Sequence, residues 1–303
     1  IDTVNRTTVS VETVTGLDDP LIFAIDVLVN PGGTHAAMAE ARTFQSLVVD
    51  IEEETAEPLA GQVVAIGDDR VVTAQRAGDT TELEFYDLAG ERVGQVDVVT
   101  PVTGMLLDDG SMLLVDEIGV IRRAAADGDV DEIGTLADPT DPAASFEVTD
   151  GTATLGGRRL LVQTGTGVHV LDDEGRQLGL AVGQVTSTVT RSSRCATIGS
   201  ARSTGTSVLV DLDDGSTRAE IPGGIPSTSS VDGCTVALIG AEGPQLVVGD
   251  EIRTIDADSI IEIAPDGSSY VVLDGRDSEL VSVEGDDNVE VADEPTVIRF
   301  AQR

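Results

Sequence analysis

The sequence predicts an all-β protein made of seven repeats, each with four short antiparallel strands. A turn followed by a short apolar strand recurs along the 303 residues, and no stretch shows sustained helical periodicity with capping signals. A period near 40 residues with four strands per repeat is typical of a propeller blade. We therefore predict a seven-bladed β-propeller of four-stranded antiparallel blades. The turns begin, in steps of 34 to 47 residues, at Gly33, Asp69, Gly110, Gly157, Ser193, Gly233 and Gly267.

The seventh repeat shows the four strands most clearly. Its expected strands are residues 259–264, 270–273, 279–283 and 288–291, with apolar and polar residues alternating in several of them. Asp and Gly at the intervening turns supply the positive φ angles that tight hairpins need. The second strand of each repeat is a nearly continuous apolar run, which indicates burial on both faces between neighbouring blades.

The third strand of several repeats ends in an aspartate. Asp50, Asp87, Asp172 and Asp211 each follow an apolar run and precede a turn. An Asp side chain at such a position accepts hydrogen bonds from backbone amides further along the turn. The copy at Val120–Arg123 lacks the aspartate. We predict that these carboxylates hold the turns into the fourth strands.

One hairpin carries a resemblance to known proteins. Residues 260–273 read Ile-Ile-Glu-Ile-Ala-Pro-Asp-Gly-Ser-Ser-Tyr-Val-Val-Leu. This resembles the repeat hairpin shared by bacterial WD40-like, lactonase-like and YVTN-type β-propellers, although the chain has no Trp for the Trp-Asp ending of true WD40 units. The resemblance implies the architecture of residues 20 to 300 and no particular family or activity.

The repeats leave the two ends of the chain less defined. We expect residues 1–20 to be an N-terminal tether or edge strand and residues 21–303 to form a single propeller domain. The strand-like segments 9–14 and 296–301 suit pairing where the first and last blades meet, and an eight-bladed ring with a composite blade is the alternative. The chain starts at Ile1, which favours a mature form that has lost an export signal or anchor, and no run of 18 apolar residues predicts a membrane span.

The chain is strongly acidic. It has 55 Asp and Glu residues against 18 basic ones, all of them Arg, so its formal net charge is −37. Such a charge repels nucleic acid and anionic lipid and favours a monomer. Basic protein surfaces, cations and neutral ligands remain as partners. A salt-adapted or exported protein from an acid-rich proteome is the favoured explanation of the charge, and a functional acidic surface for a basic partner is the alternative.

Cys195 and Cys234 open the second strands of consecutive repeats. Equivalent positions in adjacent blades are neighbours in space, so we predict a disulfide between them, which an exported protein could form. Two buried free thiols that fill space are the alternative, since the separation of blades can exceed the reach of a disulfide.

Two acidic clusters are candidate calcium ligands, and both are also typical of turns. The first is Asp127, Asp129 and Asp131, and the second is Asp211 and Asp213. The first alternates acids like a calcium loop but lacks the Gly and downstream Glu of the EF-hand. His35 and His169, the two histidines, fall in distant repeats and do not suit a catalytic triad. We expect no catalytic residues and no cofactor.

The sequence therefore favours a binding role. We predict a non-catalytic, extracytoplasmic propeller that serves as a platform for another protein, such as a membrane or cell-envelope protein, in an accessory or sensor role. Arg122-Arg123 and Arg158-Arg159 are expected to neutralise neighbouring acids rather than bind an anion. The alternative is a lactonase-like hydrolase with an acidic metal site in the central channel.

Overall fold

The computed structural model describes most of the chain between residues 24 and 293. The expected tether at residues 1–20 and the strand-like segments 9–14 and 296–301 lie outside the described residues. Most of the long insertion after residue 137 lies outside them as well. The described residues are 24–30, 32–40, 46–53, 55–137, 147–153, 159–182, 194–198, 206–222, 224–230, 232–240, 243–264, 266–274, 277–283 and 288–293.

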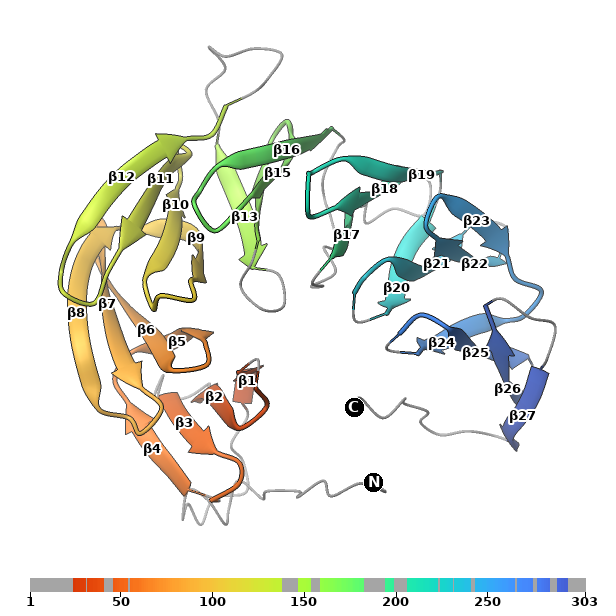
Figure 1. Ribbon diagram of the computed structural model, residues 1–303, viewed down its shortest axis with the longest axis horizontal. Helices are drawn as coiled ribbons and strands as arrows, with labels where there is room; N and C mark the ends of the chain where they lie inside the picture. Colours follow the sequence, from red (N-terminus) through yellow and green to blue (C-terminus); the bar gives the residue numbers. More distant parts are fainter. Residues whose placement is uncertain are drawn as a thin grey trace. The chain divides into compact units, whose positions relative to one another are not determined.

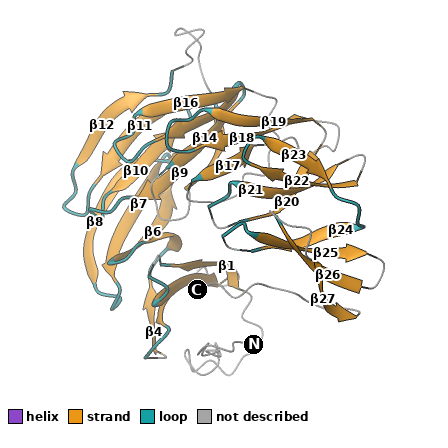
Figure 2. Cartoon of the chain, turned by 45° about the vertical axis from the view of Figure 1, so that its right-hand side comes forward, coloured by secondary structure: helices purple, strands orange, loops and turns teal. Residues whose placement is uncertain are grey.

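Within these ranges the regular structure is β-strand and no helix occurs, as predicted (Figures 1 and 2). The described strands form seven antiparallel sheets, numbered here in chain order, and in each sheet consecutive strands are neighbours. Six sheets have four described strands, and sheet 5 has three. The stretch before sheet 5, where its first strand is expected, includes residues 183–193, which lie outside the described residues. The number of blades stays a prediction, because both terminal segments also lie outside them.

The chain divides into two compact units. The first unit contains sheets 1 to 3. Sheet 1 is β1 (Ala24–Val29), β2 (His35–Glu40), β3 (Ser46–Asp50) and β4 (Thr55–Leu59). Sheet 2 is β5 (Gln62–Ile66), β6 (Arg70–Ala77), β7 (Thr80–Asp87) and β8 (Arg92–Val99). Sheet 3 is β9 (Pro101–Leu106), β10 (Met112–Asp116), β11 (Val120–Ala124) and β12 (Val130–Thr135).

The second unit contains sheets 4 to 7. Sheet 4 is β13 (Val148–Ala153), β14 (Leu160–Thr164), β15 (Gly167–Leu171) and β16 (Gln177–Val182). Sheet 5 is β17 (Cys195–Ile198), β18 (Thr206–Asp211) and β19 (Thr217–Pro222). Sheet 6 is β20 (Gly224–Ser229), β21 (Thr235–Gly240), β22 (Gly243–Val248) and β23 (Glu251–Thr254). Sheet 7 is β24 (Ser259–Ile263), β25 (Ser269–Asp274), β26 (Asp277–Ser282) and β27 (Asn288–Asp293), close to the four strands predicted for the seventh repeat. Whether residues 21–303 behave as a single domain stays a prediction.

The core lies between consecutive sheets of each unit. The second strands are buried on both faces, as predicted: Val71 and Val72 in β6 are both inaccessible to solvent, and all five residues of β10 are buried. In the first unit, one apolar cluster joins β6, β7 and β8 to β10 and β11, and another joins sheet 1 to sheet 2. Similar clusters join sheets 4 to 5, 5 to 6 and 6 to 7 in the second unit. Aliphatic side chains make up most of these clusters, since aromatic residues are 2% of the chain.

The fourth strands approach the next sheet closely enough to require glycine. β8 has a bulge at Val93, next to Gly94, and a Cβ atom on Gly94 would lie 1.8 Å from the carbonyl oxygen of Ala126 in the β11–β12 turn. β16 repeats this arrangement: a Cβ on Gly179 would lie 2.5 Å from the carbonyl oxygen of Gly215 in the β18–β19 turn. In both cases, the turn that precedes the fourth strand of one sheet contacts the backbone of the fourth strand of the preceding sheet.

This contact predicts the effect of one added methyl group. We expect Gly94→Ala to lower the free energy of unfolding by about 1–3 kcal/mol, because the turn at Ala126 must move to admit the new Cβ. Gly134→Ala is the matched control, since Gly134 in β12 also follows a bulge but has open space around its Cβ position. Urea unfolding of both variants measures the difference. Equal stabilities for the two variants would show that the close approach is not maintained in solution.

Candidate functional site

The carboxylates at the ends of the third strands hold the turns that follow them, which confirms the sequence prediction. In Asp50, Asp87, Asp172 and Asp211, one carboxylate oxygen accepts backbone N–H groups two to four residues further along, at 2.8–3.0 Å. These N–H groups would otherwise be unpaired at the turn, so the bonds fix the path into the fourth strand.

Sheet 3, whose third strand lacks this aspartate, places a similar bond at a different turn. Asp116 ends the second strand, β10, and accepts the N–H groups of Ile118 and Val120. Its second oxygen lies 2.5 Å from the Arg122 guanidinium. Asp116 and Arg122 are largely buried, so the charged pair stabilises the β10–β11 hairpin from within.

The second oxygen of two other strand-end aspartates also pairs with arginine. Asp172 accepts a hydrogen bond from Nε of Arg176 at 2.8 Å. Asp211 accepts one from Nε of Arg218 at 2.8 Å and another from its Nη2. A carboxylate that already accepts turn amides and an arginine has few lone pairs left for a metal ion. These aspartates therefore stabilise the turns and pair with arginine.

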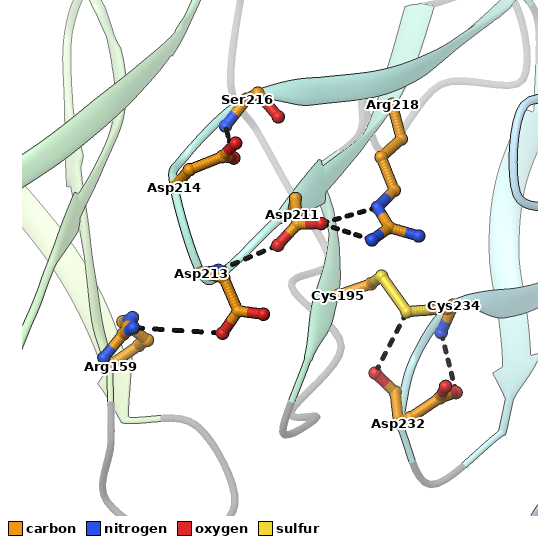
Figure 3. Close-up of polar contacts among 9 residues, drawn as sticks. All are labelled: Arg159, Cys195, Asp211, Asp213, Asp214, Ser216, Arg218, Asp232 and Cys234. Atoms are coloured by element: carbon orange, nitrogen blue, oxygen red, sulfur yellow. Dashed lines mark hydrogen bonds and ion pairs between the residues drawn. A yellow bond between two sulfur atoms is a disulfide. The ribbon is translucent and has the colours of Figure 1, made fainter.

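The structure assigns the five calcium candidates to turns and strands. Asp213 donates its N–H to Asp211 and its carboxylate lies 4.0 Å from Arg159 (Figure 3). Asp127 accepts the N–H of Asp129 in the β11–β12 turn, and Asp131 lies opposite Arg123 in the ladder. Over the ranges that the structure describes, no group of three or more His, Cys, Asp or Glu side chains is arranged to hold a metal ion.

In a second recurring turn, the carboxylate of an aspartate accepts a hydrogen bond from the hydroxyl of the serine two residues later. Ser111, Ser216 and Ser268 each donate a backbone N–H to the aspartate two residues earlier. These serine contacts hold the pKa values of Asp214 and Asp266 below the usual range. Burial raises the pKa of Asp109, but Ser111 and Arg123 outweigh it and the net shift is downward. These three aspartates therefore remain charged at neutral pH.

A disulfide joins sheets 5 and 6 in the second unit. Cys195, the first residue of β17, is bonded to Cys234, which directly precedes β21, with their Cα atoms 5.0 Å apart (Figure 3). The N–H of Cys195 also donates to the carbonyl of Asp232, at 2.8 Å, and the Asp232 carboxylate accepts the N–H of Cys234. Cys195 is fully buried in the apolar cluster between the two sheets.

Arg159 makes a comparable connection between sheets 4 and 5. It precedes β14, donates a hydrogen bond through Nε to the carbonyl of Leu212, and faces the carboxylate of Asp213 (Figure 3). This confirms the expectation that Arg159 neutralises a neighbouring acid. Arg123 does the same through its contact with Asp109. Arg158 lies outside the described residues.

The histidines have separate surroundings. His35 lies 3.4 Å from the carboxylate of Asp50 and contacts Thr34 through Nδ1. His169 is fully buried in β15, where its Nε2 lies 3.3 Å from the hydroxyl of Thr164. Each histidine therefore contacts residues of its own sheet.

One polar cluster was not predicted from the sequence. Glu84 in β7 is buried, accepts a hydrogen bond from the Tyr86 hydroxyl at 2.7 Å, and lies 2.6 Å from Nη1 of Arg92. Burial and the bond to Glu84 raise the pKa of Tyr86, whose hydroxyl also accepts the N–H of Ala60. The cluster joins sheet 2 to the segment that leaves sheet 1. Its one sequence signal is that residues 84 and 86 share a face of the strand.

The acids outside the strands gather at one end of the sheets. In each meander the first and third strands are parallel, so the turns after them lie at the same end, which we call the acidic turn side. At the opposite end, the acids of the described connections are Asp79, Glu117, Glu147, Asp256 and Asp258. The acidic turn side comprises Glu52, Glu53, Asp68, Asp69, Glu91, Asp108, Asp109, Asp127 and Asp129 in the first unit, and Asp172, Asp173, Glu174, Asp213, Asp214, Asp232, Asp250 and Asp266 in the second.

Comparison with known proteins gives no specific family. No protein-family model and no curated protein sequence matches the chain. Among solved structures, hydrazine synthase of Kuenenia stuttgartiensis is similar at 10% identity and a TM-score of 0.49, covering 88% of this chain and 97% of that one. The β-propeller domain of Cps50 (Swd1) from Myceliophteria thermophila is similar at 13% identity and a TM-score of 0.48, covering 86% and 97%. BamB from Moraxella catarrhalis is similar at 16% identity and a TM-score of 0.44, covering 85% and 81%.

The class of the protein follows from its own sheets. Consecutive antiparallel meanders, one per sequence repeat and packed face to face within each unit, define a β-propeller. The chain is therefore a β-propeller protein, and its sequence assigns it to no particular family within that fold. None of the described residues forms a helix of the length and apolar character needed to span a membrane.

The disulfide gives a direct prediction. Labelling of denatured, unreduced protein is expected to find no free thiol, and recovery of two thiols would refute the bond. We also expect the Cys195→Ala/Cys234→Ala variant to lose about 2–5 kcal/mol of unfolding free energy, because the bond closes a loop between residues 39 apart. An unchanged stability in denaturant would contradict this contribution.

Proposed function

We propose that this chain is a non-catalytic, extracytoplasmic β-propeller that binds the basic surface of another protein through its acidic turn side. A cell-envelope protein is the partner that this location favours, with the propeller in an accessory or sensor role. The carrying observation is the concentration of exposed turn acids, such as Glu52 and Glu53, at one end of the sheets. Rows of like charge on a rigid scaffold attract and orient an oppositely charged protein.

The structural role of the strand-end acids supports this proposal. Asp87 and Asp211 are engaged by turn amides, which leaves the neighbouring, more exposed acids as the groups that face solvent. Short turns with little conformational freedom hold these exposed carboxylates in place. A partner that pairs with them therefore gains charge contacts without ordering long loops.

The disulfide supports the proposed location. Disulfides persist in secreted and periplasmic proteins and are rare in the reducing cytosol. The bond between Cys195 and Cys234 connects two sheets of the second unit, so its formation contributes to the folded core rather than to a mobile loop. An oxidising compartment suits such a bond.

Two matched variants test the partner surface. Glu52→Gln/Glu53→Gln removes two charges from the acidic turn side, and Asp79→Asn/Glu117→Gln removes two from the opposite end of the sheets. After cross-linking on intact cells with a membrane-impermeant reagent, the tagged protein should retain a partner. We expect the first variant to bind that partner about threefold to tenfold more weakly and the second to bind normally, because each exposed ion pair contributes up to about 1 kcal/mol.

Two results would contradict the proposal. One is equal binding by both variants, which would place the partner elsewhere on the protein. The other is a tagged protein that the impermeant reagent fails to reach, which would exclude the extracytoplasmic location. Hydrolysis of a lactone that depends on an added divalent ion would favour the lactonase-like alternative.

A further inference from the structure

We propose that Asp150, in β13 of sheet 4, is a site of covalent modification, where the aspartate converts spontaneously to isoaspartate. In this reaction the backbone nitrogen of the residue after an aspartate attacks the carboxyl carbon of the aspartate side chain. Glycine at the second position favours the attack, because it has no side chain to block the approach and its backbone is conformationally permissive. The modification does not depend on the proposed partner surface.

The two reacting groups of Asp150 and Gly151 contact each other. The N–H of Gly151 donates a hydrogen bond to a carboxylate oxygen of Asp150, with the nitrogen and oxygen 2.7 Å apart. β13 is the first strand of its sheet, paired with β14 on one side and with no described strand on the other (Figure 1). In such a strand every second residue directs its N–H away from the ladder, where a side chain can accept it. The contact involves neighbouring residues of one strand only.

The other Asp-Gly pairs of the described ranges lie in turns, where both groups have different partners. Each of these glycines has a positive φ and donates its N–H to a backbone carbonyl three or four residues earlier, at 2.8–3.1 Å. Each aspartate accepts the N–H of the residue after the glycine, at 2.9–3.2 Å. The pairs are Asp109-Gly110, Asp127-Gly128, Asp214-Gly215, Asp232-Gly233 and Asp266-Gly267. Attack at these pairs requires those hydrogen bonds to break first, whereas the hydrogen bond of Gly151 already joins the reacting groups.

The conversion consumes and releases only water. The Gly151 nitrogen forms a bond to the side-chain carboxyl carbon of Asp150, and the carboxyl hydroxyl leaves with the amide proton as water, which gives a five-membered succinimide ring. Water then adds to the main-chain carbonyl of the ring and opens it to isoaspartate, so the total mass is unchanged. Ring closure requires rotation about the Cα–C bond of Asp150. The bulge at Thr149 and the single pairing partner of β13 reduce the number of ladder bonds that oppose this rotation.

Isoaspartate changes the strand that contains it. The main chain then runs through the side-chain carbon of residue 150, which adds one methylene group to the backbone of β13. Gly151, Thr152 and Ala153 lie opposite Val162, Leu161 and Leu160 of β14, and a longer backbone cannot keep this register. The modification is therefore expected to weaken the pairing of β13 with the rest of sheet 4.

The test compares two Asp-Gly pairs within one peptide of the whole protein. Trypsin releases residues 124–158 as a single peptide that contains both Asp150-Gly151 and the turn pair Asp127-Gly128, because no Lys or Arg lies between Arg123 and Arg158. The folded protein is aged at mildly acidic pH, where part of any carboxyl population is neutral, and electron-transfer fragmentation locates isoaspartate in the peptide. We expect isoaspartate to form at Asp150 at least about fivefold faster than at Asp127, because the turn pair must first break its hydrogen bonds. Equal rates, or a faster rate at Asp127, would overturn the proposal.

Two controls separate the effect of the fold from that of the local sequence. In protein unfolded by denaturant, the rates at Asp150 and Asp127 are expected to agree within about twofold, since both pairs then lose their native contacts. If Asp150 kept its full advantage in the unfolded chain, the contact in β13 would not be the cause and the proposal would fail. Asp150→Glu retains the charge but requires a six-membered ring, so it should form no isomer at residue 150 and leave the rate at Asp127 unchanged. An undiminished yield at residue 150 in this variant would also contradict the proposal.

Discussion

The hydrogen bond from a turn amide to a strand-end carboxylate is the interaction on which the rest of this fold depends. In sheet 2, Asp87 fixes the β7–β8 turn, and Gly90 of that turn then lies against Glu57 of the preceding sheet, where an added Cβ would come within 2.7 Å. In sheet 5, Asp211 fixes the turn whose Gly215 contacts Gly179 in the same way. A turn that is positioned by one charged side chain can pack at backbone distance against its neighbour. The fixed turns therefore determine how closely neighbouring sheets pack.

Close backbone approach also explains how the chain forms a core with so few aromatic residues. Large rings usually fill the space between the blades of such folds, whereas here Val, Leu, Ile and Ala form most of the buried clusters. Specific links between sheets add to them: the disulfide between Cys195 and Cys234, the bond from Arg159 to Leu212, and the contact of Tyr86 with Ala60. Each link lies beside an apolar cluster and is at least partly buried, so the interaction is stronger than at a fully exposed surface.

Local patterns in the sequence were sufficient to predict the features that depend on local chemistry. The repeat period, the strands of the seventh repeat and the capping role of Asp172 all follow from residue type and spacing. The bulges next to Gly94 and Gly179 were not predicted, because a bulge is defined by the partner strand as much as by its own residues. The buried cluster around Glu84 was missed because an acidic residue in an alternating strand is normally exposed. For the acidic turn side, the composition predicted a strong negative charge. The strand order of the meanders was needed to place that charge at one end of the sheets.

The central claim is that the acidic clusters are parts of turns and a surface for a basic partner, rather than ligands for a metal. Melting temperatures measured in sodium chloride, and again in calcium chloride at matched ionic strength, test it most directly. The account predicts a rise between about 0.01 M and 0.5 M salt, as screening relieves repulsion among the turn acids, with the same curve for both salts. A stabilisation specific to calcium that is lost in the Asp211→Asn/Asp213→Asn variant would contradict it, because those carboxylates would then be ligands.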